Sequence, residues 1–160
     1  MSKTKMEYVE VNGENYYKIN NCNGMRPFFM SIVSDSNHWL FISSNGGLTA
    51  GRKNNEYALF PYYTDDKITE SFETTGSKSI YSVTIKGVNH VWEPFSDQYK
   101  GVYAFSRNLY KNEYGNKVIF EEINHDLGLR YQCEWNSSNE YGFVKKSTLF
   151  NESTEELIVK

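Results

Sequence analysis

The amino-acid sequence predicts an all-β protein in which residues 1–160 form one two-layer antiparallel β-sandwich. Aromatic residues make up 16% of the chain, with 13 Tyr and 10 Phe, and aromatic side chains favour strands. Turn residues separate short apolar runs roughly every 8 to 12 positions, which is typical of sandwiches and barrels. No interior segment repeats its apolar residues with the period of a helix.

The first part of the chain predicts two pairs of strands. Residues 6–11 and 16–19 flank Asn12-Gly13, a dipeptide that favours a tight hairpin turn. Residues 28–33 and 39–42 are continuous apolar runs on either side of a polar turn. Because such runs are typical of strands that are buried on both faces, we expect this pair at the centre of a sheet.

The middle of the chain continues with short segments. Residues 57–60 and 68–72 are apolar and flank a polar turn at 64–67. Apolar and polar side chains then alternate over 81–85, the pattern of a half-buried strand, and 88–92 continues it after a Lys-Gly turn.

The last third contains the clearest strand. Residues 102–105 alternate, a turn follows at 112–116, and 117–123 returns along the chain. Five apolar side chains then alternate with other residues, which places all five on one face of a strand: Leu127, Leu129, Tyr131, Cys133 and Trp135. Residues 141–150 are its expected neighbour.

The C-terminal segment allows two predictions. Residues 153–156 have the spacing of a helix capping box, whereas the β-branched residues after Leu157 favour a strand. The apolar run continues to the last residue, Lys160, so we expect the sequence to be part of a longer protein.

Charge and cysteine content exclude several classes of function. The net charge of −3 comes from 17 basic and 20 acidic residues without long blocks, so we expect neither nucleic acid nor a membrane as a partner. No signal peptide or membrane-length apolar run is present, which predicts a cytoplasmic protein. Cys22 and Cys133 lack the spacing of metal ligands, so we expect two thiols and no cofactor.

The acidic residues and histidines do not predict a catalytic site. We expect the carboxylates to lie in solvated turns or on outward strand faces, among them Glu73, Glu93, Asp97, Glu121 and Glu122. Glu121 and Glu122 are neighbours in a predicted strand and therefore point to opposite faces. The three histidines lack metal-ligand spacing: His38, His90 and His125.

A glycine-rich stretch at 44–52 follows the strand-like residues 38–43. Glycine permits left-handed backbone and lets another group approach the main chain closely. One interpretation is a binding loop, and the other is a tight connection between strands in which Asn45-Gly46 supplies positive φ angles. The stretch lacks the Lys-Ser/Thr ending of a phosphate-binding loop, so nucleotide binding is not expected.

An aromatic loop at 92–99 is the second candidate for binding. Tyr and Trp have a flat apolar face and a polar rim, which suits the C–H face of a sugar ring, and neighbouring Asn, Arg or Asp can bind the hydroxyl groups. The alternative is that these aromatic residues simply fill the core beneath the loop. Residues 60–63, Phe-Pro-Tyr-Tyr, have a similar composition and more often serve ordinary packing.

Residues 42–52, together with Ile68-Thr69 and the Val-Trp-Glu-Pro segment at 91–94, resemble the N-terminal domain of the cellobiose phosphorylase group of glycoside hydrolases. The resemblance covers roughly residues 30–160. It implies a galactose mutarotase-like supersandwich, of which this chain contains only the first part, joined to an (α/α)6 barrel. The barrel would supply a single catalytic Asp, and phosphate or water would attack. Residues 49–51 depart from the family pattern, which has Ser followed by aromatic residues.

The resemblance and the two candidate loops together predict a set of non-catalytic, substrate-binding residues: Asn45, Gly46, Gly47, Arg52, Trp92, Phe95, Asp97 and Tyr99. The expected partners are an oligosaccharide, the downstream barrel and a second copy of the chain. Inorganic phosphate is the expected co-substrate of the parent enzyme.

Three functions follow from this reading. The leading hypothesis is a carbohydrate-contacting, non-catalytic domain of a glycoside phosphorylase or hydrolase. A self-contained sugar epimerase of the mutarotase type is the first alternative, and it requires a histidine that faces a carboxylate in a cleft. A purely structural dimerisation domain is the second.

Overall fold

The computed structural model describes residues 3–60 and 64–160, without the side chains of Asp65 and Asp66. The predicted all-β class is confirmed, because the described residues form twelve strands in three antiparallel sheets and one short α-helix. The predicted aromatic segment at 60–63 lies, after Phe60, outside the described residues. No helix in the described part of the chain has the length and apolar character needed to cross a membrane.

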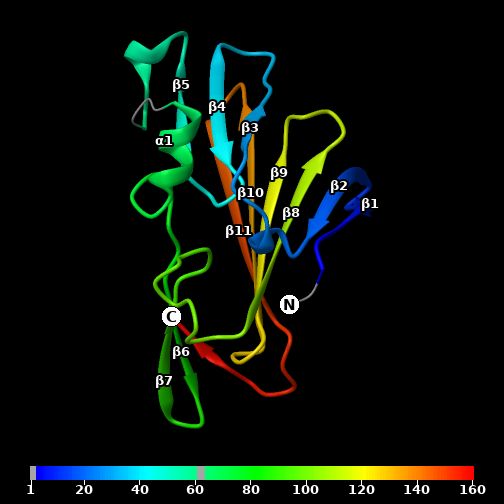
Figure 1. The fold of residues 1–160 in the computed structure, drawn as a ribbon, viewed down its shortest axis with the longest axis vertical. Helices are drawn as coiled ribbons and strands as arrows, with labels where there is room; N and C mark the ends of the chain where they lie inside the picture. The colour runs from blue at the N-terminus through cyan, green and yellow to red at the C-terminus, as the bar shows by residue number, and fades with distance from the viewer. Residues whose placement is uncertain (1–2, 61–63) are drawn as a thin grey trace.

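The largest sheet has six strands in the order β1-β2-β8-β9-β10-β11 (Figure 1). Its strands are β1 (Lys5–Val11), β2 (Glu14–Asn20), β8 (Phe105–Asn112), β9 (Val118–Asn124), β10 (Leu129–Ser138) and β11 (Gly142–Asn151). The predicted hairpin between β1 and β2 is confirmed: Asn12 and Gly13 have φ angles of 52° and 81°, as a tight turn with two left-handed residues requires.

Two three-stranded sheets form the second layer (Figure 1). One has the order β3-β4-β5, with β3 (Phe29–Ile32), β4 (His38–Ser43) and β5 (Leu48–Arg52). The other has the order β12-β6-β7, with β12 (Ile158–Val159), β6 (Tyr81–Ile85) and β7 (Val88–Trp92). Buried apolar side chains from all three sheets form one core cluster, which is consistent with a β-sandwich.

The alternation predicted for β10 is confirmed. Leu129, Tyr131, Cys133 and Trp135 are between 1% and 7% exposed and belong to the central core, together with Leu127 just before the strand. The residues between them are half-buried on the opposite face.

The expectation that the 28–33 run would be buried on both faces is wrong. In its sheet β3 is an edge strand, and the Phe29 side chain is 40% exposed. On the outer face Phe29 packs against Phe41, with ring centroids 5.1 Å apart, and Phe41 contacts Trp39 at 5.8 Å. The apolar run therefore reflects an aromatic row on the outer surface of the sheet and not a second buried face.

Two further segments differ from the sequence prediction. The expected polar turn at 64–67 is the start of α1 (Asp65–Glu70). In this six-residue helix Ile68 is buried, and so short a helix shows no apolar period in the sequence. The glycine-rich stretch contains β5, which the sequence analysis did not recognise as a strand. At the C-terminus the strand alternative is confirmed, because β12 pairs with β6.

Candidate functional site

The glycine-rich stretch forms the tight turn between β4 and β5. Gly46 has a φ angle of +98° and donates its amide to the Ser43 carbonyl oxygen at 2.9 Å. A Cβ atom on Gly47 would lie 2.1 Å from the carbonyl oxygen of Ile68 in α1. The interpretation as a tight connection between strands is therefore confirmed, although the positive φ angle comes from Gly46 and not from Asn45. The group that approaches the glycine backbone is the chain's own helix.

Asn45 fastens this turn to the helix. Its Oδ1 accepts a hydrogen bond from Ser43 Oγ at 2.5 Å, and its Nδ2 donates to the Thr69 carbonyl oxygen at 2.9 Å. Both ends of the amide thus fix the position of α1 (Asp65–Glu70) beside the β4–β5 hairpin (Figure 1).

The aromatic loop after β7 contains a strained residue. Phe95 has a φ angle of +67°, which is rare for a bulky side chain and costs on the order of 1–3 kcal/mol. Its amide donates to Glu122 Oε2 at 2.7 Å, and its ring packs edge-on against Phe120, with centroids 5.6 Å apart. These contacts hold the loop against the six-stranded sheet.

Two carboxylates, Glu122 and Glu73, hold the aromatic loop by accepting hydrogen bonds from it. Glu122 is 2% exposed and also accepts hydrogen bonds from Trp92 Nε1 at 2.8 Å and Arg107 Nε at 2.7 Å. Glu73 accepts from the Asp97 amide at 2.5 Å and from Ser96 Oγ at 3.2 Å.

The expectation of a solvated position is wrong for Glu121 and Glu122, which are 4% and 2% exposed. The pairing of β8 with β9 explains both, because it sets Arg107 opposite Glu122 and Asn108 opposite Glu121 as hydrogen-bonding partners. The prediction that the two carboxylates point to opposite faces is confirmed: Glu122 binds the core-facing Trp92, whereas Glu121 binds Tyr110 on the other face.

Arg107 is the functional residue that the sequence analysis missed. Its side chain is 9% exposed, and besides Glu122 it donates to the Ser96 carbonyl oxygen at 2.9 Å and to Asp97 Oδ1 at 3.3 Å. The guanidinium lies 5.4 Å from the Phe95 ring and 4.6 Å from the Phe105 ring. The sequence does contain a signal for this position. Side chains two residues apart in a strand lie on the same face, so Arg107 shares a face with Phe105 and the buried Leu109.

The carboxylates with shifted pKa values near the loop are stabilised as anions. Burial raises the pKa of Glu73, but hydrogen bonds from the Asp97 amide and from Lys78 outweigh it, so the pKa lies below its ordinary value. Burial acts in the same direction on Asp97, and Lys100 and Arg107 reverse it, so this pKa is also lowered.

A cleft of about 530 Å³ lies between the glycine turn and the aromatic loop. Its apolar lining includes Phe72 and Phe105. Its polar lining comes from Asn23, Ser44, Asn45, Thr69, Glu70, Asp97, Lys100 and Arg107. We call it the Asn45–Asp97 cleft. Its volume is in the range that holds small ligands, roughly 300–1,000 Å³. Asn45 of the glycine turn and Asp97 of the aromatic loop, which lie far apart in the sequence, both line this cleft.

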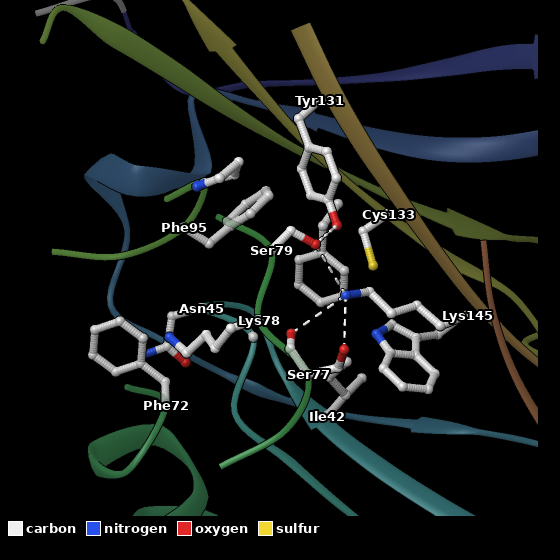
Figure 2. Close-up of a pocket in the computed structure, with 14 residues that line it drawn as sticks. Ile42, Asn45, Phe72, Ser77, Lys78, Ser79, Phe95, Tyr131, Cys133 and Lys145 are labelled. Carbon is white, nitrogen blue, oxygen red and sulfur yellow. Dashed lines mark hydrogen bonds between the residues drawn. The ribbon is translucent and has the colours of Figure 1, made fainter. Parts of the chain in front are cut away.

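A smaller cavity of about 40 Å³ shares Asn45 and Phe72 with this cleft, and its lining also includes Gly46 and Phe95 (Figure 2). At about 15 Å³ for each water, it has room for two or three water molecules and not for a sugar. Figure 2 shows Lys145 pointing toward the segment that contains Ser77 and Ser79, where its Nζ lies 2.9 Å from Ser77 Oγ. Tyr131 Oη lies 3.0 Å from Ser79 Oγ.

The other predicted site residues do not line the Asn45–Asp97 cleft. Trp92 is 1% exposed and belongs to the core, and Gly47 is buried under α1. Tyr99 stacks on Tyr103 with centroids 6.1 Å apart. Arg52 lies at the far end of β5, in a different cleft.

His38 and His125 contact serine hydroxyl groups, and both cysteines are buried. His38 Nδ1 lies 2.8 Å from Ser36 Oγ, and His125 Nε2 lies 2.8 Å from Ser106 Oγ. Cys22 and Cys133 are free and buried, which confirms that both are thiols. In residues 3–60 and 64–160, no group of three or more His, Cys, Asp or Glu side chains is arranged to hold a metal ion.

No protein-family model matches the chain, and no curated protein sequence matches it significantly. The resemblance to the cellobiose phosphorylase group therefore stays a prediction from the sequence.

Proposed function

We propose that this chain is a non-catalytic, carbohydrate-contacting β-sandwich domain that binds an oligosaccharide in the Asn45–Asp97 cleft. The observation that carries the proposal is the meeting of two candidate loops at one cleft of about 530 Å³. The glycine turn contributes Ser44 and Asn45 to the lining, and the aromatic loop contributes Asp97. The glycines of the turn and the aromatic side chains of the loop lie outside the lining.

The lining has the chemistry that a sugar requires. Phe72 and Phe105 offer apolar surface to the C–H groups of a pyranose, while Asn23 and Asp97 offer hydrogen-bonding groups to its hydroxyls. Arg107 has five N–H donors, of which three serve the bonds described above, so donors remain for a ligand.

The pKa directions support a binding role over a catalytic one. A glycosidase needs one carboxylic acid whose pKa is raised, so that it can protonate the leaving oxygen. Glu73 and Asp97 have lowered pKa values and are poor proton donors at neutral pH. We therefore place the bond-breaking acid on another domain of the parent protein.

The parent is proposed to be a cytoplasmic glycoside phosphorylase or hydrolase that cleaves a β-linked oligosaccharide by inversion, with phosphate or water as the attacking group. The proposed partners are the oligosaccharide, a downstream (α/α)6 barrel and a second copy of the chain. Exposed aromatic side chains support self-association, because Tyr8, Tyr17 and Tyr114 are between 52% and 70% exposed.

Calorimetric titration with cellobiose and longer β-glucans tests the proposal. We expect millimolar or tighter binding by the natural chain and at least a fivefold weaker association constant for Asp97→Asn, which removes one charge from the cleft. Asp35→Asn is the matched control, because Asp35 is exposed and lies outside the cleft. Absence of binding, or equal losses in the two variants, would contradict the proposal and favour a purely structural domain.

A further inference from the structure

A second cleft, of about 400 Å³, opens at the end of β5 opposite the glycine turn. Its lining includes Arg52, Phe60, Trp135, Tyr141, Phe143 and Lys145. We call it the Arg52–Lys145 cleft. It shares no lining residue with the Asn45–Asp97 cleft, and nothing in the proposed function assigns it a role.

The two cations of this cleft have no acidic partner among the residues that the structure describes. In the described part of the chain neither Arg52 nor Lys145 forms an ion pair, and no carboxylate is among the described residues that line the cleft. Lys145 donates to neutral oxygens in the described part of the chain, with Nζ 2.9 Å from Ser77 Oγ, 3.4 Å from the Ser77 carbonyl oxygen and 3.4 Å from Ser79 Oγ.

Several other cations of the molecule pair with carboxylates, whereas Lys111 binds the backbone carbonyl oxygens of Ser31 and Gly115. Lys78 binds Glu73 at 3.0 Å, Arg130 binds Glu152 at 2.6 Å, and Lys117 forms an ion pair with Glu14. A chain with a net charge of −3 has acidic residues available for such pairs. The positive charge of Arg52 and Lys145, which has no acidic partner among the described residues, complements an anion.

The cleft also has aromatic side chains in its lining, some of which pack against the core and one of which is largely exposed. Tyr141 is 76% exposed, and Phe143 packs on His38 with ring centroids 5.1 Å apart. Arg52 lies across Gly142, where a Cβ atom would be 3.3 Å from Nη2. A glycine at this position of the β10–β11 turn thus leaves room for the guanidinium at the edge of the aromatic wall.

We propose that the Arg52–Lys145 cleft binds a small anionic sugar, with the ring against the aromatic side chains and a carboxylate or phosphate group between Arg52 and Lys145. Guanidinium and ammonium groups bind both anions through charge-assisted hydrogen bonds. The hydroxyls of Ser77 and Tyr141 are available to the sugar, whereas no amide side chain is present among the described lining residues to read a nucleobase edge. This proposal is independent of the neutral-sugar site.

Calorimetric titrations at low salt with glucuronate, glucose 6-phosphate, glucose and inorganic phosphate test it. We expect at least one anionic sugar to bind ten times more tightly than glucose and more tightly than phosphate alone, with affinity that falls as salt is added. The glucuronate and glucose 6-phosphate arms tell a carboxylate ligand from a phosphate ligand.

Arg52→Gln and Lys145→Gln should each weaken this binding at least fivefold. Lys146→Gln is the matched control, because Lys146 is the next residue of β11, points to the opposite face and lies outside the cleft. Since Arg52 is exposed, its variant folds even if Lys145→Gln does not. Asp97→Asn should leave the anionic sugar bound, which separates this site from the first. Equal affinity for glucose or for phosphate alone, or an equal loss in Lys146→Gln, would overturn the proposal.

Discussion

Single residues of the glycine-rich stretch act for different physical reasons. Gly46 supplies a left-handed backbone, Gly47 admits the Ile68 carbonyl, and Gly51 lets the Trp39 ring lie over the strand, where a Cβ would be 2.4 Å from Cζ2. From the sequence we expected either a turn or a close approach, and both occur. The identity of the approaching group was not predictable, because it belongs to a segment more than twenty positions away.

Gly47→Ala should destabilise the fold strongly. The added methyl group would overlap the backbone of α1, which cannot move without breaking the hydrogen bond from Asn45, so we expect a loss of about 2 kcal/mol or more. Urea unfolding measures the change. Gly24→Ala is the control, because a Cβ there meets only Thr4 Oγ1 at 3.6 Å, and a loss as small as in this control would contradict the account.

Arg107→Leu should leave Glu122 as an unpaired buried charge. Breaking one partner of a buried ion pair costs about 3–5 kcal/mol, whereas replacing both partners by Leu costs less. Chemical unfolding of Arg107→Leu, Glu122→Leu and the double variant gives the interaction energy between the two side chains. Lys100→Leu, at a side chain that is 70% exposed, should change the stability little. Similar losses for Arg107→Leu and Lys100→Leu would rule out the role of Arg107.

Acid should weaken the loop through Glu73 and Asp97. The pKa of each carboxyl is lower in the folded state than its ordinary value of 4.5 or 3.8. Each group therefore contributes stability above that ordinary value, and the contribution is lost as the pH falls through the folded-state pKa. The stability difference between the natural chain and Glu73→Gln, measured by urea unfolding, should be present at neutral pH and shrink below about pH 4. A difference that is independent of pH would contradict this.

At the scale of elements, strands with strict alternation were predictable and short or irregular ones were not. The 127–135 pattern identified β10, because a two-residue period over nine positions fits only a strand with one buried face. The helix α1 was missed because, among its described side chains, Ile68 is the one that is buried. The β3 strand was placed at a sheet centre because an aromatic row on the outer face looks the same in sequence as a buried face.

Leu129→Ala tests the importance of the β10 face. Leu129 is 1% exposed, and removing such a side chain from a core costs about 2–5 kcal/mol. Leu59→Ala is the control, because Leu59 is 67% exposed and should cost little. Thermal and urea unfolding measure both. Equal effects would mean that this face does not form the core.

At the scale of the whole molecule, the sequence predicted the two layers and two candidate loops but not how the loops meet. Asn45 and Asp97 are brought to one cleft by the packing of the β4–β5 hairpin against the six-stranded sheet, which is a long-range result of the fold. Trp92, predicted for the same site, is instead a core residue that binds Glu122. Arg52 was grouped with the glycine turn by sequence, yet it is the last residue of the five-residue strand β5 and lies at the end away from that turn.

The most direct test of the central claim is amide chemical-shift mapping during titration with cellotetraose. The account predicts that the largest shifts fall on the residues that line the Asn45–Asp97 cleft, with Asn45, Asp97 and Arg107 among them, and that they saturate together. Shifts that are absent, or that concentrate on surfaces away from this cleft, would contradict it.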